Sequence, residues 1–183
     1  YLNTTNTSAT MPAGTVFTAS VSDSSYQFVT IQDVTATNIG SVIPFNSLSV
    51  YEGSYVSTRY TTDTQNVKQR FLINDARADT TTLTVKVQNS STDSITATYT
   101  LATDIAALTS TSNVYFLQEV EDGKFEIYFG DDILGNAVED GNIIILNYVV
   151  TNKGVANGAA IFTQSAAIDT VNSVNVSTVS SSA

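Results

Sequence analysis

Residues Lys124–Gly158, KFEIYFGDDILGNAVEDGNIIILNYVVTNKGVANG, contain the only long runs of β-branched and aromatic residues in the chain. Phe125, Ile127 and Phe129 alternate with polar neighbours, which is the period-2 pattern of a strand with one buried face. Residues Ile143–Val150 contain a single polar side chain, Asn147, and this predicts a strand that is buried on both faces.

The segment between these two strands has the chemistry of turns. Gly130–Asp132 and Glu139–Gly141 combine glycine, which accepts a positive φ, with Asp, whose side chain bonds to nearby backbone. We therefore expect a hairpin with a wide loop around Leu134. Its tip carries the carboxylates of Asp131, Asp132, Glu139 and Asp140.

Alternating patterns continue on the N-terminal side of this stretch. Val114–Val120 precedes it, and Asp122-Gly123 predicts a tight turn between the two. Leu83, Val85 and Val87 alternate with polar residues, and a matching run from Ile95 to Leu101 predicts the return strand of a hairpin. Asp104–Leu108 predicts one helical turn, capped by Asp104 or Thr103.

The remaining segments also favour short strands. We expect residues 1–10 to be a polar surface segment or the continuation of a previous element. From Met11 we expect a Pro-initiated turn and then a short strand that runs through Ser20. The other predicted strands are Tyr26–Thr37 with an irregularity near Asp33, Ser41–Val50, Tyr55–Thr61, Lys68–Ile73 and one within Ala159–Val179.

Turns every few residues indicate a mainly β fold of antiparallel sandwich- or barrel-like modules with very little helix. Breaks at Tyr51–Gly53 and at Asn157-Gly158 predict a central β-module over residues 51–157. Residues 1–50 together with 158–183 are predicted to form a second, smaller and discontinuous module. Because the chain starts at Tyr1 without an initiator methionine, we expect it to be a fragment of a longer chain.

The composition makes several partners improbable. The chain has 17 acidic and 7 basic residues and a net charge of −10, so it repels phosphate backbones and we expect no nucleic acid partner. No apolar run approaches the roughly 20 residues that cross a bilayer, so we expect no membrane partner. With 42% apolar residues, the chain can form a packed core.

Catalytic chemistry has few resources in this chain. Histidine and cysteine are absent, which excludes Ser-His-Asp and Cys-His catalysis and most zinc, copper and haem sites. Acid pairs are left, with Glu119, Glu121 and Glu126 flanking the Asp122-Gly123 turn, and an acid-pair hydrolase stays open as one alternative. We assign no catalytic, cofactor-binding or metal-ligating residue, and we expect no enzymatic activity, cofactor or small-molecule substrate.

Two further sets of residues stay open as sites. The four loop carboxylates at Asp131, Asp132, Glu139 and Asp140 are either a cation site or solvated turn residues. A second set, Tyr115, Leu117, Tyr128 and Tyr148, either fills the core between sheets or forms an interface, where Tyr is favoured.

The opening stretch resembles the baseplate-J family of contractile-tailed bacteriophages. The shared pattern reads Ile127-Tyr-Phe-Gly-Asp-Asp132, Gly135, Gly141-Asn-Ile143, Tyr148-Val-Val-Thr-Asn152 and Gly154–Gly158, with Met11-Pro-Ala-Gly-Thr-Val-Phe17 and Val50-Tyr-Glu-Gly53 upstream. The chain departs from the family at Asp132, where a second Gly is usual, and in residues 136–140, which lack the usual Pro.

This resemblance implies a structural role. Such proteins form the inner ring of a tail baseplate wedge around the hub, by self-association and by contacts with other wedge proteins. The resemblance also implies that the protein is part of the virion tail baseplate, which is assembled in the bacterial host cytoplasm. A sugar- or host-binding β-module of a fibre or adhesin stays as the alternative, although the chain has no Trp to stack on a sugar ring.

Overall fold

The structure is a computed structural model that describes residues 1–66, 69–152, 156–164, 166–172 and 174–176. The described residues form fifteen β-strands and two short 3-10 helices, and none of them lies in an α-helix. The prediction of a mainly β chain with very little helix is confirmed. In the described part of the chain, no helix has the length and apolar character needed to span a membrane.

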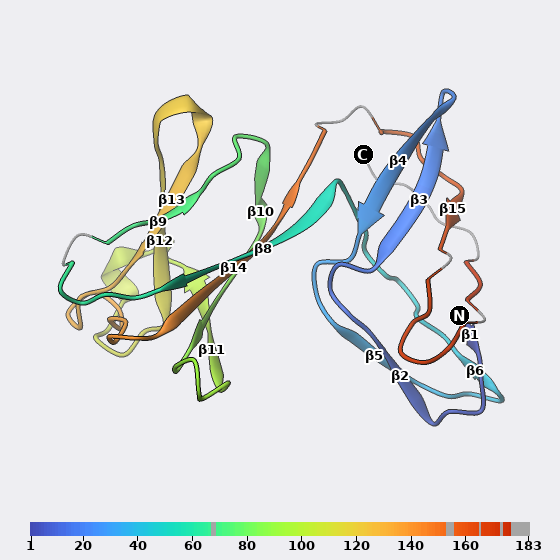
Figure 1. The fold of residues 1–183 in the computed structure, drawn as a ribbon, viewed down its shortest axis with the longest axis horizontal. Helices are drawn as coiled ribbons and strands as arrows, with labels where there is room; N and C mark the ends of the chain where they lie inside the picture. The colour runs from blue at the N-terminus through green and yellow to red at the C-terminus, as the bar shows by residue number, and fades with distance from the viewer. Residues whose placement is uncertain (67–68, 153–155, 165, 173, 177–183) are drawn as a thin grey trace. The chain divides into compact units, whose positions relative to one another are not determined.

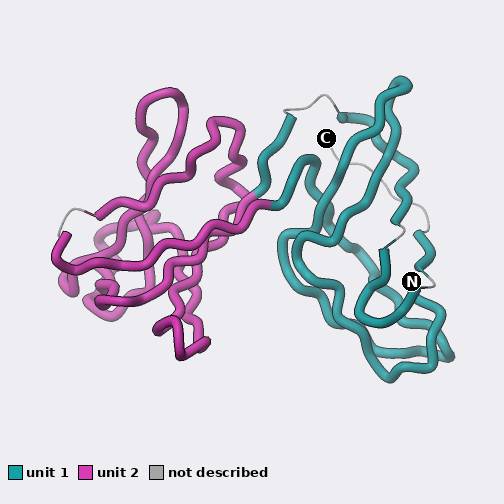
Figure 2. The backbone as a smooth tube through the Cα atoms, viewed as in Figure 1, with its two compact units in different colours: residues 1–55, 149–183 teal, residues 56–148 magenta. Residues whose placement is uncertain are grey.

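The chain divides into two compact units, which Figure 2 colours separately. Unit 1 combines Tyr1–Tyr55 with Val149–Ala183, and unit 2 is Val56–Tyr148. The chain passes from one unit to the other inside strands β8 (Ser54–Thr61) and β14 (Ile143–Val150). The predicted domains, residues 51–157 and residues 1–50 with 158–183, stay a prediction.

Unit 2 is built on one seven-stranded sheet that curves into a nearly closed barrel (Figure 1). In the order of neighbours, its strands are β8, β14, β10 (Ala78–Gln88), β11 (Thr96–Leu101), β12 (Val114–Glu119), β13 (Phe125–Phe129) and β9 (Phe71–Ile73). The predicted hairpin is confirmed, since β10 and β11 pair antiparallel from Val85 with Tyr99 to Gln88 with Thr96. The strand predicted over Lys68–Ile73 contains β9, and its first residue, Lys68, lies outside the described residues.

The sequence does not predict the parallel pairing of β11 with β12 in this sheet. β11 and β12 pair in parallel, with Thr100 opposite Val114. A parallel pair needs a crossover connection, and this one contains the 3-10 helix η1 (Ile105–Ala107). The predicted cap is confirmed, because the Asp104 side chain accepts a hydrogen bond from the Ala106 backbone N–H at 3.0 Å.

The expected hairpin between Phe125–Phe129 and Ile143–Val150 is wrong. β13 pairs antiparallel with β12 and β9, while β14 neighbours β8 and β10, so both strands have both edges occupied. The connecting segment Gly130–Asn142 is longer than the loops of two to five residues that usually join the two strands of a β-hairpin. It instead carries the chain from one part of the barrel wall to another.

Side chains close the barrel where β8 and β9 face each other. The Tyr60 hydroxyl donates to the Leu72 carbonyl at 2.5 Å, and Gln69 Nε2 donates to the Thr61 carbonyl at 3.0 Å. An aromatic chain continues inward, with centroids 5.6 Å apart for Tyr60 and Phe71, 5.6 Å for Phe71 and Phe129, and 5.2 Å for Phe129 and Tyr99. Branched aliphatic residues complete the core: Ile73, Val85, Ile127, Ile144 and Leu146.

Unit 1 divides its backbone pairing among three small sheets. The largest has the order β15 (Phe162–Thr163), β3 (Val16–Val21), β4 (Ser24–Val29) and β7 (Tyr51–Glu52). The other two pair β1 (Leu2–Asn3) with β6 (Val42–Ile43), and β2 (Ser8–Met11) with β5 (Val34–Thr37). Their shared hydrophobic core includes Leu2, Met11, Phe17, Phe28, Ile43, Phe162, Ile168 and Val171.

Unit 1 corrects several of the strand predictions. Residues 1–10 are mostly exposed, as expected for a surface segment, but they also form β1 and most of β2 and fully bury Leu2. Ser41–Val50 is a strand only at Val42–Ile43. Within Ala159–Val179, the described residues contain one strand, β15, and isolated bridges at Ile168, Val171 and Val174, while Val179 lies outside them.

The strand expected over Tyr26–Thr37, with an irregularity near Asp33, is interrupted at residues 30–33 and so forms two strands, β4 and β5. The residues between them hold the neighbouring turn: Thr30 Oγ1 donates to the Pro12 carbonyl at 2.8 Å, and Asp33 Oδ1 accepts from the Ala13 N–H at 2.8 Å. The Pro12–Thr15 segment is thus a turn, as its resemblance to the phage family implies. Side-chain bonds to that turn take the place of a continuous strand.

Candidate functional site

Pieces of the family pattern that are far apart in sequence meet in unit 1. The Glu52 carboxylate accepts three hydrogen bonds: from Thr151 Oγ1 at 2.7 Å, from the Asn152 N–H at 2.8 Å and from Asn152 Nδ2 at 2.7 Å. Bonds to an ionised acceptor are stronger than neutral ones. Glu52 therefore ties the end of β7 to the residues that follow β14.

Gly53 is required for the close approach beside this carboxylate. Its φ is +126°, and a Cβ added there would lie 2.2 Å from the Val150 carbonyl oxygen and 2.8 Å from Val149 Cγ1. Only glycine combines this φ with such close packing. The contacts between Glu52-Gly53 and the segment that ends in Thr151-Asn152 thus hold these two segments of the chain together in unit 1.

The Gly130–Asn142 loop has a defined conformation at its tip. Asp131 Oδ1 accepts hydrogen bonds from the backbone N–H groups of Leu134 at 3.0 Å and Ile133 at 3.1 Å. These backbone bonds lower the pKa of the Asp131 carboxyl from its ordinary value. Gly130 and Gly135 meet below the tip, since a Cβ on Gly130 would lie 2.3 Å from the Gly135 carbonyl oxygen.

Asp132 is one position at which the chain departs from the family pattern, and its conformation explains why Asp is tolerated there. Its φ is +63°, in the left-handed region that glycine adopts freely and that Asp tolerates better than most residues. Its Oδ1 accepts from the Ala137 N–H at 2.9 Å. Asp132 therefore adopts a backbone conformation that the glycine usual in the family also accepts.

The other two loop acids lie where the loop returns to the barrel. Asp140 Oδ1 accepts from the Thr64 N–H at 3.0 Å, and the backbone of Glu139 bonds to the buried Asn142 side chain. Among the described residues, no three Asp or Glu side chains come close enough together to hold a metal ion. The Asp131 and Asp132 carboxylates instead bind backbone N–H groups of their own loop, and Asp140 binds the backbone of the Asp63–Asn66 segment.

The acids around the Asp122-Gly123 turn are also separated. Gln118 is the register partner of Glu126, and Glu119 is the partner of Phe125. Because successive side chains point to opposite faces of a strand, Glu119 and Glu126 lie on opposite faces of the sheet. These two carboxylates do not meet across a common cleft.

The predicted tyrosine face is split by the sheet. Tyr115 and Tyr148 are buried in the barrel, and Leu117 shares its face with the buried Ile127. Tyr128 instead pairs with Phe116 on the opposite face. The core interpretation therefore holds for Tyr115 and Tyr148, and Tyr128 belongs to a different surface.

Burial raises the pKa of the phenols of Tyr60, Tyr99 and Tyr115. Burial disfavours the charged phenolate, so these side chains stay neutral, and the hydroxyls of Tyr60 and Tyr99 take part in hydrogen bonds. Asn136 Nδ2, for example, donates to the Tyr99 hydroxyl at 3.1 Å.

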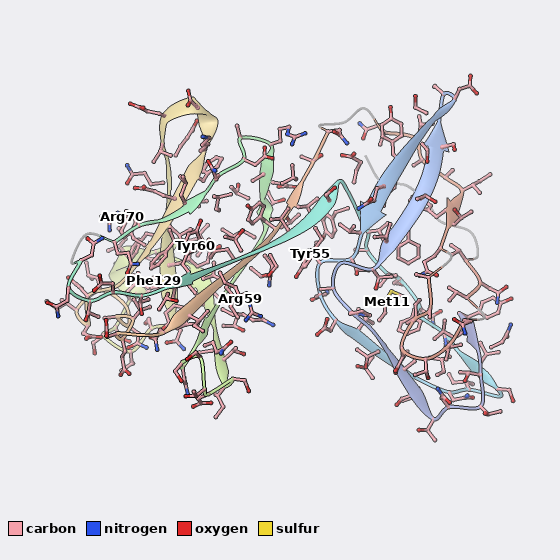
Figure 3. All side chains as sticks on the ribbon, viewed as in Figure 1. Met11, Tyr55, Arg59, Tyr60, Arg70 and Phe129 are labelled. Carbon is pink, nitrogen blue, oxygen red and sulfur yellow. The ribbon has the colours of Figure 1, made fainter. Side chains whose placement is uncertain are left out.

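An aromatic and cationic surface lies on the outer face of β9, β12 and β13. The rings of Phe116 and Tyr128 stack with centroids 5.1 Å apart, and the Arg70 guanidinium lies 4.4 Å from the centroid of the Tyr128 ring. Arg70 Nε is 3.7 Å from Glu126 Oε1, and the Leu72 side chain next to them is 36% exposed. Arg70, Leu72, Phe116, Glu126 and Tyr128 are called the Arg70 patch below, and Figure 3 labels Arg70 in unit 2.

Arg70 and Phe116 are not among the residues predicted from the sequence, although period-2 alternation contains the signal for both. Arg70 and Leu72 alternate with the buried Phe71 and Ile73. Phe116 likewise follows the buried Tyr115. Apolar residues on both faces of a strand indicate that the outer face also packs against another surface.

Comparison with known proteins gives two consistent matches. Residues 57–164 match the family model described as bacteriophage baseplate wedge protein gp6, third domain. The chain is also 27% identical over 185 aligned positions to baseplate wedge protein gp6 of Enterobacteria phage T4, an alignment that covers 91% of this chain. It spans 27% of the length of that relative.

Proposed function

The chain belongs to the family of the third domain of bacteriophage baseplate wedge protein gp6, and from this premise we propose that it helps to form the inner ring around a phage tail hub. In this role, copies of the chain associate with each other and with other baseplate wedge proteins. The protein is then a structural component of the virion tail baseplate, assembled in the cytoplasm of the bacterial host.

The observation that carries this proposal is the extent of the family match. Residues 57–164 include nearly all of unit 2, Val56–Tyr148, so the match covers a whole folded barrel and not a single motif. A fold alone does not imply a function, but here the family itself is defined by a structural protein of the baseplate.

We also propose that the chain has no enzymatic activity. Glu119 and Glu126 lie on opposite faces of one sheet, which does not suit a pair of carboxylates acting on one bond. The side chains of Asp131 and Asp132 accept hydrogen bonds from backbone N–H groups of their own loop, and that of Asp140 accepts one from the Thr64 N–H of another loop.

Immunogold electron microscopy tests the proposal. Antibody raised against the 183-residue chain is applied to tailed particles from the source, with antibody pre-adsorbed on the pure chain as the control. We expect gold at the distal end of the tail. Gold confined to fibres would favour a sugar- or host-binding module, and antigen found only free in the lysate would contradict a virion role and reopen the hydrolase.

A further inference from the structure

The Arg70 patch and the tip of the Gly130–Asn142 loop have complementary chemistry. Resting on the proposed self-association, we propose that the loop tip of one copy of the chain docks on the Arg70 patch of a second copy. Both surfaces belong to unit 2.

The patch combines an anchored cation with exposed apolar surface. Stacking on Tyr128 and the contact with Glu126 limit the conformations of the Arg70 side chain, which nevertheless remains 42% exposed. Besides the Glu126 contact at Nε, the described residues engage Arg70 through a bond from Nη1 to the Gln69 carbonyl at 3.3 Å. A guanidinium has five N–H donors, so it retains capacity for a carboxylate from another molecule. Arg and aromatic residues are enriched where interfaces hold most of their binding energy.

A hollow of about 270 Å³ lies directly beside the patch. Its lining includes Arg70, Phe71, Tyr128, Phe129 and Val138, with polar residues such as Asp63 and Asn66 also on its wall. Apolar surface next to polar groups is the usual arrangement of a protein interface. This hollow admits an aliphatic side chain from a partner.

The loop tip supplies the matching groups. Ile133 is 73% exposed and Leu134 is 43% exposed, so neither fills a hollow of its own molecule. Asp131 and Asp132 precede them directly, and residues 130–142 contain four acidic and no basic residues. Since the Asp131 side chain and the Gly130–Gly135 contact hold the tip in one conformation, docking loses little conformational freedom.

The charge of the chain favours this contact over other contacts between copies. At a net charge of −10, two copies repel each other wherever acidic surfaces meet. A contact that places the tip carboxylates against Arg70 offsets more of that repulsion than a contact between acidic surfaces does, and it sets the register. The inference is therefore a tip-to-patch contact, in which unlike surfaces of two copies meet.

Analytical ultracentrifugation of the 183-residue chain tests this contact with two kinds of variant. Arg70→Glu disables the patch. The triple variant Asp131→Asn, Asp132→Asn, Ile133→Ser disables the tip but keeps the Oδ1 acceptors that hold the loop. Arg59→Glu is the matched control, because Arg59 is exposed on β8 outside the patch. Circular dichroism checks that each variant is folded.

We expect wild type to self-associate and each of the two variants to raise the dissociation constant about tenfold or more. Arg59→Glu changes it by less than about threefold. An equimolar mixture of the patch variant with the tip variant restores association, because the intact tip of one meets the intact patch of the other.

Wild type that stays monomeric, a tip variant that associates as wild type does, or a mixture no better than its components would each overturn the inference. These results differ from a failure of the proposed function. Gold at the tail tip with a monomeric chain would reject this contact alone. Self-association without gold on particles would reject the function alone.

Discussion

In unit 2 one sheet of seven strands supplies the backbone pairing, whereas in unit 1 the pairing is divided among sheets of four, two and two strands. Unit 1 compensates with side chains that bond to backbone over long sequence distances. Asn38 Nδ2, for example, donates to the carbonyls of Thr4 and Asn6, both at 2.8 Å. The comparison teaches that a barrel wall and a set of anchored short strands are two ways to satisfy the same backbone groups.

The largest expected effects test whether the two cores are separate. Phe71→Ala removes a ring from the unit 2 core, and Phe28→Ala removes one from the unit 1 core, where its ring lies 4.9 Å from that of Phe162. Each substitution should cost about 3–5 kcal/mol in the free energy of unfolding. If the units are domains, Phe71→Ala shifts one unfolding transition and Phe28→Ala shifts the other in differential scanning calorimetry. One shared transition moved equally by both would contradict separate domains.

Next in size is the backbone contact at Gly53 in unit 1. Gly53→Ala places a Cβ 2.2 Å from the Val150 carbonyl oxygen, so we expect a loss of about 3 kcal/mol by urea unfolding. Gly40→Ala is the control, since Gly40 also has a positive φ, +64°, but nothing within 4 Å of the added Cβ. It should cost only about 1 kcal/mol. Equal costs would show that the Val150 contact is unimportant.

In unit 2 the corresponding anchor is a buried amide. Asn142 Nδ2 donates to the Asn89 carbonyl at 2.9 Å, and its Oδ1 accepts from the Glu139 N–H at 2.7 Å. Asn142→Ala leaves both backbone groups without this partner and should cost about 2 kcal/mol. Gln118→Ala, on the exposed part of β12, should change stability by less than about 0.5 kcal/mol. An Asn142→Ala protein as stable as wild type would refute the anchor.

A smaller effect is expected at the unit 1 anchor. Glu52→Gln removes the charge but keeps one acceptor oxygen for Thr151 and Asn152, so we expect a loss of about 1 kcal/mol. Glu119→Gln makes the same chemical change at an exposed site and serves as the control in urea unfolding. A loss no larger than in the control would mean that the charge of Glu52 does not strengthen these bonds.

The smallest effect is an acid sensitivity carried by unit 2. The Arg77 side chain lowers the pKa of Asp75, the Asn89 side chain lowers that of Asp93, and backbone N–H groups of the loop tip lower that of Asp131. A folded-state pKa below the ordinary 3.8 adds stability that is present above that value and is lost as the pH falls through the folded pKa. Carboxyl NMR titration should give a titration midpoint below pH 3.8 for each of the three groups. Midpoints at or above pH 3.8 would contradict these bonds.

The difference between the units also decides what the sequence predicts correctly. Long alternating runs such as residues 82–88 predict strands of the barrel, because one face of each is buried over many residues. β1 and β6 have two residues each and contain no period to detect. Their burial depends on contacts from distant parts of the chain.

Strand neighbours are harder to predict than strands. The apolar pattern of β14 correctly predicts burial on both faces. Its neighbours are β8 and β10 and not β13, because β12 and β9 occupy the two edges of β13. No local signal contains that information. The turn acids are identified from sequence, whereas the Arg70 patch depends on the register that sets Phe116 opposite Tyr128.

The most direct test of the central proposal is a cryo-electron microscopy reconstruction of the baseplate on intact particles from the source. We expect the seven-stranded barrel of unit 2 to fit density that is repeated in a ring around the tail hub. A ring with no such barrel, or a barrel found only in fibres, would contradict it.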